Sequence, residues 1–212
     1  MSRIFVFAAS KSEADPLARL VGVSRWDTPN HAGPITAGPN QLEFFITGMG
    51  PKQATERAVQ ILSRGRGLHS EGEQVGEVPD LAIVIGLCGS LTDSLEESAI
   101  VMYSSCLSAM NGGTSCSCAP ELSEQVTAPL NAQNMVCKSA SGVTSAHAAI
   151  NKDDKLRPAG TGAKVVDMES YGILSAAHKL GVPTIVVRVV SDHRHAALGN
   201  QVIQGDEQCA VR

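Results

Sequence analysis

Residues 165–192 read VVDMESYGILSAAHKLGVPTIVVRVVSD and contain a helix followed by a strand. The helix is expected from Ser170 to Leu180 and should end at Gly181, a residue type that favours helix C-termini. Pro183 to Val190 is a β-branched run of the kind that is buried in a parallel sheet. A helix, a short Gly-Val-Pro connection and a buried strand together form the repeating unit of an α/β fold.

Other segments extend this pattern toward the N-terminus. A second helix is expected from Lys52 to about Arg64, since Ala54, Ala58 and Ile61 recur at helical spacing. Three more short aliphatic runs bounded by turn residues predict strands: Arg3 to Ala9, Leu42 to Ile46 and Asp80 to Ile85. We predict an α/β fold in a single three-layer domain, residues 1–212, whose central mixed, largely parallel twisted sheet is flanked by helices.

Two polar stretches lack a regular hydrophobic period. Residues 65–78 are polar and Gly-rich and predict a loop or an insertion. Residues 104–135 are rich in Ser, Gly, Asn and Cys and predict irregular or edge structure. We expect no internal repeat and no second domain.

The composition is that of a soluble globular protein. Hydrophobic residues make up 43% of the chain and charged residues 18%, and the aromatic content of 3% leaves the core to aliphatic side chains. The net charge of −4 gives no basic field for nucleic acid. No apolar run reaches the roughly 18 residues that a membrane span needs. The N-terminus shows no signal-peptide pattern, so a cytoplasmic location is expected.

The chain contains six cysteines, which we expect to be reduced in a cytoplasmic protein. Cys116 and Cys118 are separated by one residue, whereas zinc ligands are usually separated by about two to four. His193 and His195 form a second closely spaced pair. Neither pair is accompanied by a convincing second pair of ligands, so no metal site is predicted.

Carboxylates stand where the predicted strands end. Asp192 follows a buried strand, the position at which α/β enzymes keep reactive groups, and Glu13 similarly follows the first strand. Asp167 and Glu169 are expected in the first turn of the next helix, where the helix dipole favours negative charge. Helix capping explains Asp167 equally well, whereas Glu169 could accept two hydrogen bonds from adjacent ribose hydroxyls. Each carboxylate alone is more simply structural, but their joint position at strand ends indicates a site.

Two glycine-bearing turns also follow predicted strands. They are Gly48-Met49-Gly50 and the segment from Gly86 to Gly89. Glycine lets backbone N–H groups approach a ligand closely, although a tight turn without any ligand is the simpler interpretation of each alone. Two such turns at the carboxyl ends of strands in one sheet predict a shared crevice.

In this order the motifs resemble those of the nucleoside phosphorylase and nucleosidase superfamily, which includes purine nucleoside phosphorylases and methylthioadenosine/S-adenosylhomocysteine nucleosidases. Residues 166–170, VDMES, resemble the family's Met-Glu ribose motif, and Ser191-Asp192 resembles its Ser-Asp catalytic motif at the usual separation. The turns at Gly48 and Gly86 match its two glycine loops. The resemblance runs from Arg3 to about Asp192, and the Asp-Met-Glu-Ser stretch is also similar to that of hopanoid-associated members.

The resemblance implies a role for each matching residue. Glu169 would bind the ribose 2′ and 3′ hydroxyls, and Met168 would pack against the sugar. Asp192 would be the general acid that protonates N7 of a departing purine, with Ser191 helping to orient it. Glu13 would activate the water nucleophile, although the acidic run common before it in those nucleosidases is missing here.

The resemblance also bears on the base, the cofactor and the assembly. His147 falls where family members contact the base and is the candidate base ligand, a solvated loop histidine being the simpler alternative. Gly48 and Gly86 would lie against the substrate. No cofactor is implied, since an oxocarbenium-like path needs only placed acids and a nucleophile. A homo-oligomer is expected because the superfamily usually assembles that way.

Two positions distinguish water from phosphate as the nucleophile. Many phosphorylases of the family have an arginine three residues before the Ser or Thr of a glycine loop, and both contact phosphate. Val84 and Leu87 stand at the matching positions here, and a dianion without a guanidinium partner binds poorly. We therefore predict a nucleosidase that hydrolyses a purine nucleoside or a 5′-substituted thioadenosine.

Two alternatives to hydrolysis stay open. Arg188 or a neighbouring subunit could provide the missing charge, which would allow a phosphate-dependent phosphorylase, for example one that acts on an adenosyl-lipid. The departures at Val84 and Leu87 and the short polar segment after Asp192 also fit a catalytically inactive member that binds a nucleoside.

Overall fold

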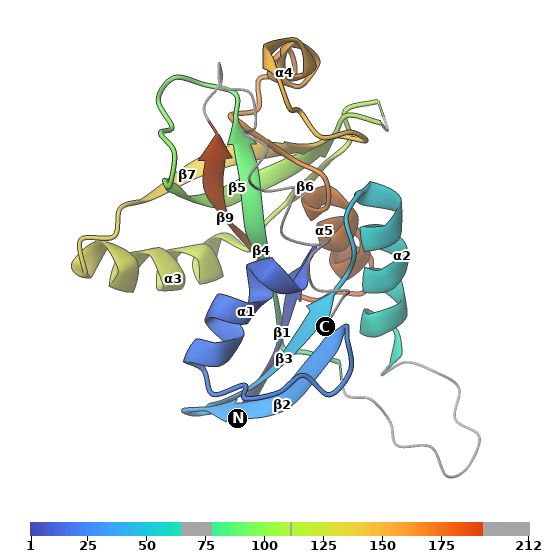
Figure 1. Ribbon diagram of the computed structural model, residues 1–212, viewed down its shortest axis with the longest axis vertical. Coiled ribbons are helices and arrows are strands. Elements are labelled where there is room, and N and C mark those ends of the chain that lie inside the picture. Colours follow the sequence, from blue (N-terminus) through green and yellow to red (C-terminus); the bar gives the residue numbers. More distant parts are fainter. Residues whose placement is uncertain (65–77, 111, 193–212) are drawn as a thin grey trace, which may run out of the picture.

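The computed structural model describes residues 1–64, 78–110 and 112–192 (Figure 1). In chain order the described strands are β1 (Ser2–Ala8), β2 (His31–Ala37), β3 (Asn40–Ile46), β4 (Leu81–Ser90), β5 (Ile100–Ser108), β6 (Ser115–Ser117), β7 (Cys137–Thr144), β8 (Val165–Asp167) and β9 (Thr184–Asp192). The described helices are α1 (Lys11–Leu20), α2 (Pro51–Leu62), α3 (Pro120–Ala132), α4 (Lys152–Ala159) and α5 (Ser170–Lys179).

All of these strands belong to one mixed sheet. Its order is β2-β3-β1-β4-β8-β7-β5-β6, and β9 pairs with both β4 and β5. The pairs β1/β3, β1/β4, β4/β9, β5/β7 and β7/β8 are parallel, and the pairs β2/β3, β4/β8, β5/β6 and β5/β9 are antiparallel. Because β9 joins β4 to β5, the strands β4, β8, β7, β5 and β9 form a closed circuit.

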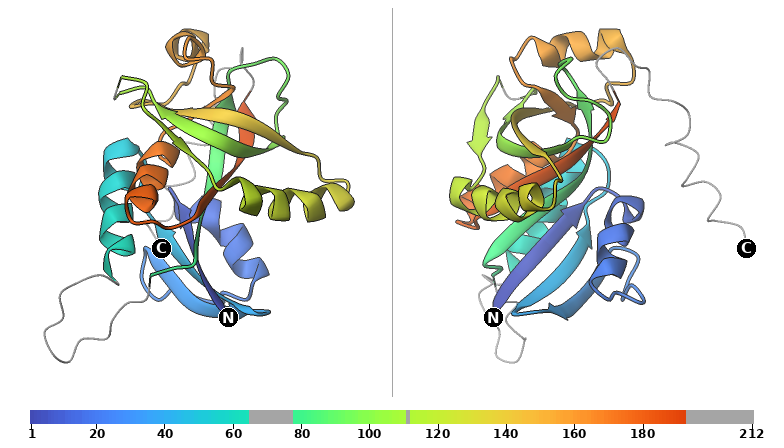
Figure 2. Two further views of the ribbon diagram at one scale, coloured as in Figure 1. Left: turned by 180° about the vertical axis from the view of Figure 1, so that it is seen from behind. Right: turned by 90° about the vertical axis from the view of Figure 1, so that its left-hand side faces the viewer.

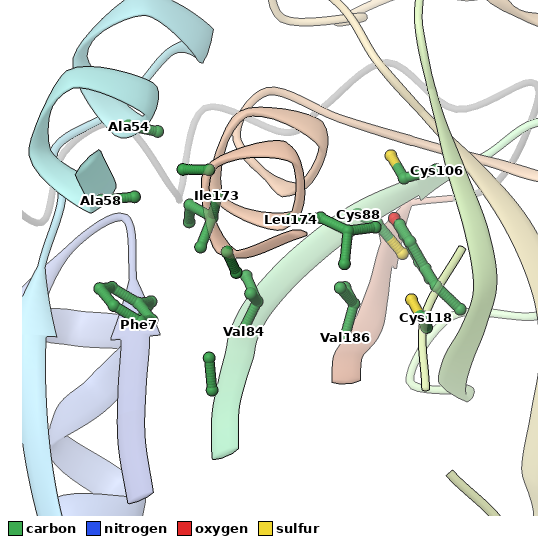
Figure 3. Close-up of a cluster of buried hydrophobic side chains, with 14 of the residues drawn as sticks. Phe7, Ala54, Ala58, Val84, Cys88, Cys106, Cys118, Ile173, Leu174 and Val186 are labelled. Carbon is green, nitrogen blue, oxygen red and sulfur yellow. The ribbon is translucent and has the colours of Figure 1, made fainter. Parts of the chain in front are cut away.

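Helices cover both faces of the sheet, which confirms the predicted three-layer α/β architecture. Side chains alternate between the two faces of a strand. Val6 of β1 and Phe44 of β3 pack with α1, while the neighbouring residues Phe7 and Phe45 pack with α2 and α5. Figure 3 shows Phe7 beside α2 and Ile173 of α5 beside β4, and α2 and α5 lie side by side in Figures 1 and 2. The assignment of residues 1–212 to one domain stays a prediction.

The elements expected from hydrophobic period alone are present, and their ends shift by two residues or fewer except in β4, which was predicted to end at Ile85 and runs to Ser90. In residues 104–135 the prediction of irregular structure is wrong for two elements. β5 runs to Ser108 inside the sheet, and residues 120–132 form α3. Pro120 at the first position favours the start of α3, but the helix buries none of its side chains. A helix without a buried face leaves no apolar period in the sequence. β6 lies at the end of the strand order, as an edge strand.

Some predictions fall partly or wholly outside the described residues. They concern the loop at 65–78, of which only Val78 is described, the pair His193 and His195, and the segment after Asp192. Within the described part of the chain, the helices are too short or too polar to cross a membrane.

Candidate active site

A cavity of about 220 Å³ opens where β1, β4, β8 and β9 reach the same end of the sheet. Six of the eight residues predicted to form a site line it: Glu13, His147, Met168, Glu169, Ser191 and Asp192. Gly48 and Gly86 do not line this cavity, but their neighbours Met49 and Leu87 do. The fold thus gathers carboxylates that are up to 179 residues apart in sequence, from Glu13 to Asp192, around one hollow.

Asp192 is the last residue of β9 and is 5% exposed. It therefore belongs to the strand itself and not to the turn after it. Its Oδ1 accepts a hydrogen bond from Ser191 Oγ at 2.9 Å, and its Oδ2 accepts one from the ammonium group of Lys155. Ser191 Oγ also lies 3.3 Å from the carbonyl oxygen of Cys88. Both carboxylate oxygens are thus held in place by donors from the protein.

Glu169 immediately precedes α5, as the residue that caps its N-terminus, and is 5% exposed. Its Oε1 accepts a hydrogen bond from the backbone N–H of Gly50 at 3.0 Å, and its Oε2 lies 3.6 Å from Arg188 Nη2. Burial raises the pKa of Glu169, although the neighbouring guanidinium of Arg188 and the Gly50 N–H lower it. One described partner at each oxygen leaves room for each to accept a further hydrogen bond.

Asp167 is a structural carboxylate, which answers the question that its sequence position leaves open. It ends β8, and its Oδ1 accepts hydrogen bonds from the backbone N–H groups of Glu169 and Ser170, both at 3.1 Å. The same carboxylate accepts hydrogen bonds from Thr144 Oγ1 at 2.7 Å and Tyr103 Oη at 2.9 Å. Asp167 therefore precedes the helix instead of lying in its first turn, and it fixes the backbone that carries Glu169.

Glu13 lies in the first turn of α1, with its carboxylate turned back toward β1 and β4. Its Oε2 accepts hydrogen bonds from the backbone N–H groups of Ala9 and Ser10, both at 3.0 Å, which completes a capping box with Ser10. Its Oε1 accepts a hydrogen bond from the backbone N–H of Leu87 at 3.1 Å. Glu13 is thus both a helix cap and a lining residue of the cavity.

Arg188 lies behind the cavity as a buried cation. It is 1% exposed, and its Nη2 and Nε donate to Ser170 Oγ at 2.9 and 3.1 Å. Its Nε is 3.6 Å from Asp167 Oδ2, and it forms the ion pair with Glu169 described above. Burial by itself would lower the pKa of Arg188, but the charges of Asp167, Glu169 and Glu13 reverse this and raise it. Arg188 is therefore a permanent positive charge that already faces three carboxylates.

Gly86 differs from its expected place in a loop, because β4 continues through it as far as Ser90. The segment from Gly86 to Gly89 is paired with β9 and is not a turn. A side chain at Gly86 would collide with the Arg188 guanidinium and the Glu13 carboxylate, and its φ of 142° also favours glycine. The glycine is required because a cation and a carboxylate approach each other across its backbone.

The turn at Gly48 is present between β3 and α2, but Gly48 faces Gln53 and a different hollow. The backbone N–H of Gly50 is the group that reaches the site, through Glu169. Met168 is partly buried and His147 is exposed, and both line the cavity.

Lys155 and Arg188 are the site residues that sequence reasoning missed or left undefined. Lys155 is 2% exposed in a helix that was not predicted, and its contact with Asp192 has no signal in the local sequence. The described cysteines are free thiols, and the described residues contain no group of three or more His, Cys, Asp and Glu side chains placed to hold a metal ion.

Comparison with known protein families identifies one that matches this chain. A family described as "Phosphorylase superfamily" matches residues 3–211 of the chain. No curated protein matches the sequence.

Solved structures share the fold at low sequence identity. A 5′-methylthioadenosine/S-adenosylhomocysteine nucleosidase from Helicobacter pylori, with butyl-thio-DADMe-Immucillin-A, has a TM-score of 0.78 at 18% identity, covering 98% of this chain and 90% of that one. A futalosine hydrolase mutant of Helicobacter pylori strain 26695 has a TM-score of 0.76 at 18% identity, covering 91% and 86%. An S-adenosylhomocysteine nucleosidase from Streptococcus pyogenes, in complex with 5-methylthiotubericidin, has a TM-score of 0.70 at 18% identity, covering 91% and 85%. These likenesses show a common fold.

Proposed function

The chain belongs to the phosphorylase superfamily, and from this premise we propose that it hydrolyses the N-glycosidic bond of a purine nucleoside or a 5′-substituted thioadenosine. The observation that carries the proposal is a single cavity whose lining includes, besides the structural Asp167, three carboxylates with different partners: Glu169 beside Arg188, Asp192 beside Lys155, and Glu13 on backbone N–H groups. The nucleosidases and the hydrolase named above have the same fold.

The sugar is assigned to Glu169 and Met168. Each oxygen of Glu169 has one described partner and can accept one more hydrogen bond, which suits the vicinal 2′ and 3′ hydroxyls of ribose. Met168 provides an adaptable apolar surface at the cavity wall. Because Asp167 and Arg188 fix Glu169 from behind, the bound ribose would present C1′ in one orientation.

The leaving base is assigned to Asp192. Breaking the C1′–N9 bond builds positive charge on the sugar and negative charge on the base, and a proton at N7 neutralises the base as it leaves. General acid catalysis of this kind contributes about 10²- to 10⁴-fold. Ser191 holds Asp192 through Oδ1, and His147 lies at the rim of the same cavity as a candidate contact to the base.

Water is favoured over phosphate by the charges around Glu13. The Leu87 N–H, which an anion could have used, already donates to Glu13 Oε1. Arg188 is buried and already neutralised by Asp167 and Glu169. Among the described residues that line the cavity, a phosphate dianion would meet carboxylates and no guanidinium, whereas a water molecule could give its proton to Glu13. Arg188, which the sequence suggested as a possible phosphate ligand, is thus already paired with Asp167 and Glu169.

The first experiment separates hydrolysis from phosphorolysis and from binding without turnover. We expect the protein to release free base and free sugar from methylthioadenosine, S-adenosylhomocysteine, adenosine or inosine in phosphate-free buffer, at a rate that phosphate does not increase. Chromatography of the products, with and without phosphate, measures both. A sugar 1-phosphate formed only with phosphate would establish the phosphorylase alternative. Binding without release of base from any of the four would support the inactive member.

Replacing Glu13 by glutamine is expected to lower kcat for hydrolysis by about 10²-fold, because the amide cannot take a proton from water. The amide NH2 would also face one of the backbone N–H groups that now donate to the carboxylate. The stability cost is expected to be about 1 kcal/mol, as for other N-terminal caps. Steady-state kinetics and urea unfolding test the two effects separately, and Glu124→Gln, on the exposed side of α3, is the matched control. Unchanged hydrolysis in the Glu13 variant would remove Glu13 from the mechanism.

The proposal includes a homo-oligomer and a cytoplasmic location, both of which rest on the sequence-based expectations. Size-exclusion chromatography with light scattering would test the assembly directly.

A further inference from the structure

Helix α4 buries a charged side chain and exposes an apolar one. Lys155 is 2% exposed, whereas its neighbour Leu156 is 59% exposed. Lys152 and Arg157, on the same helix, are also exposed. The hydrophobic effect alone would turn the leucine inward and leave the lysine in water. The orientation of α4 therefore has to be explained by what Lys155 contacts.

Lys155 contacts Asp192. Its Nζ donates a hydrogen bond to Asp192 Oδ2, and the two form an ion pair in which both side chains are at least 95% buried. Figures 1 and 2 show α4 at the same end of the molecule as the tip of β9. The capping box between Asn151 and Asp154 fixes where α4 begins, and so fixes the direction of Lys155 one residue later.

Stability is a weak reason for this ion pair. Removing two charges from water costs several kcal/mol per ion, and their attraction at best offsets that cost, so an apolar pair of similar volume is often as stable. Asp192, the assigned general acid, is itself one member of this ion pair. Because stability does not require the pair, we expect Lys155 to have a role in the chemistry.

Both oxygens of Asp192 accept hydrogen bonds, Oδ2 from Lys155 and Oδ1 from Ser191. In the ion pair, the donor hydrogens that face Asp192 Oδ2 belong to the ammonium group of Lys155. The nearby thiol of Cys88 is a poor proton source, because burial raises its pKa to about 12. Among the described residues in contact with Asp192, Lys155 is the one with a cationic group that can give up a proton.

We propose that Lys155 delivers to Asp192 the proton that Asp192 passes to the departing base, an inference that rests on the proposed function. The Nζ–H bond of Lys155 breaks and an O–H bond forms at Asp192 Oδ2. That O–H bond then breaks as a bond from the proton to N7 forms, and the C1′–N9 electron pair goes to the base. Lys155 is left as a neutral amine and Asp192 as a carboxylate, while Glu13 takes one proton from the attacking water. Solvent restores both groups after the products leave. Lys155 is a positioning residue, since it acts through Asp192.

The test compares two leaving groups in the same variant. A purine needs a proton to leave, whereas the nitrophenolate of 4-nitrophenyl β-D-ribofuranoside does not. In Lys155→Met we expect kcat for the purine nucleoside to fall about 10²-fold and that for the nitrophenyl riboside to change little. The ratio of the two rates is independent of the fraction of folded protein, and Lys155→Gln gives a second reading if the methionine variant folds poorly. Lys152→Met, on the exposed side of the same helix, should leave both rates unchanged.

Rescue by a small amine gives a second readout that a purely structural role would not produce. Lys155→Ala leaves a space in which methylamine can approach Asp192. Its purine-cleaving rate is expected to rise with methylamine concentration, while that of the wild type stays constant.

Equal losses on both substrates, or a purine rate in Lys155→Met equal to that of the wild type, would overturn the assignment of Lys155. Those outcomes leave the proposed function intact, because the wild type still cleaves. A wild-type protein that cleaves neither substrate would instead overturn the proposed function, and the role of Lys155 with it.

Discussion

Replacing Asp192 by asparagine is expected to lower kcat for purine nucleosides by about 10²- to 10⁴-fold, with a much smaller effect on KM. The amide keeps the shape of the side chain and its hydrogen bond with Ser191, but it cannot carry a proton to N7. If Asp192 acts only by protonating the leaving base, this variant should still hydrolyse a substrate whose leaving group is nitrophenolate. Steady-state kinetics on both substrates measure the effect.

The matched control is Asp153→Asn, which removes one carboxylate from the exposed surface of α4 near the same end of the molecule. It should leave both rates unchanged. Since Asp192→Asn also leaves the buried ammonium of Lys155 without its ion pair, thermal unfolding has to be measured on the same samples. An Asp192→Asn variant that is folded and retains the wild-type rate on purine nucleosides would exclude Asp192 as the general acid.

The sequence predicted well those parts of the fold in which a buried strand or helix leaves a hydrophobic period. β9 and α5 are such elements, and their predicted ends differ from the observed ones by two residues or fewer. α3 was missed because it buries no side chain, and α4 because the residues that it buries are a lysine and a proline. Neither helix has the apolar stripe on which such predictions depend.

The candidate site was predictable as far as strand ends could be recognised. Glu13 and Asp192 meet at one cavity because β1 and β9 both run parallel to β4 and bring their carboxyl ends to the same edge of the sheet. Glu169 joins them from β8, which runs antiparallel to β4. Gly86 was assigned to a loop because a glycine after an aliphatic run signals a turn, whereas its actual role is to let Arg188 and Glu13 approach across a strand. The buried ion pairs of the site join residues from different segments of the chain: Lys155 pairs with Asp192, and Arg188 with Asp167. Such pairs produce no pattern in the local sequence.

Replacing Arg188 by methionine is expected to cost about 3–5 kcal/mol of unfolding free energy, the range for removing one partner from a buried ion pair. Methionine fills much of the same volume, so the loss comes from charge: Asp167 and Glu169 would stay buried without their cation. Urea unfolding at pH 7 measures the change. Arg19→Met is the control, because Arg19 forms an exposed pair with Asp15 at 3.5 Å that is worth at most about 1 kcal/mol.

The loss of unfolding free energy in Arg188→Met is also expected to depend on pH. The pKa of Glu169 is already raised by burial, and Arg188 opposes that rise, so removing Arg188 raises it further. A carboxyl group whose pKa is higher in the folded than in the unfolded state favours folding when it is protonated, and this contribution is lost as pH increases through the folded-state pKa. The deficit of Arg188→Met relative to the wild type should therefore shrink on going from pH 8 toward pH 5. A deficit that is independent of pH, or no larger than that of Arg19→Met, would show that the buried carboxylates do not depend on Arg188.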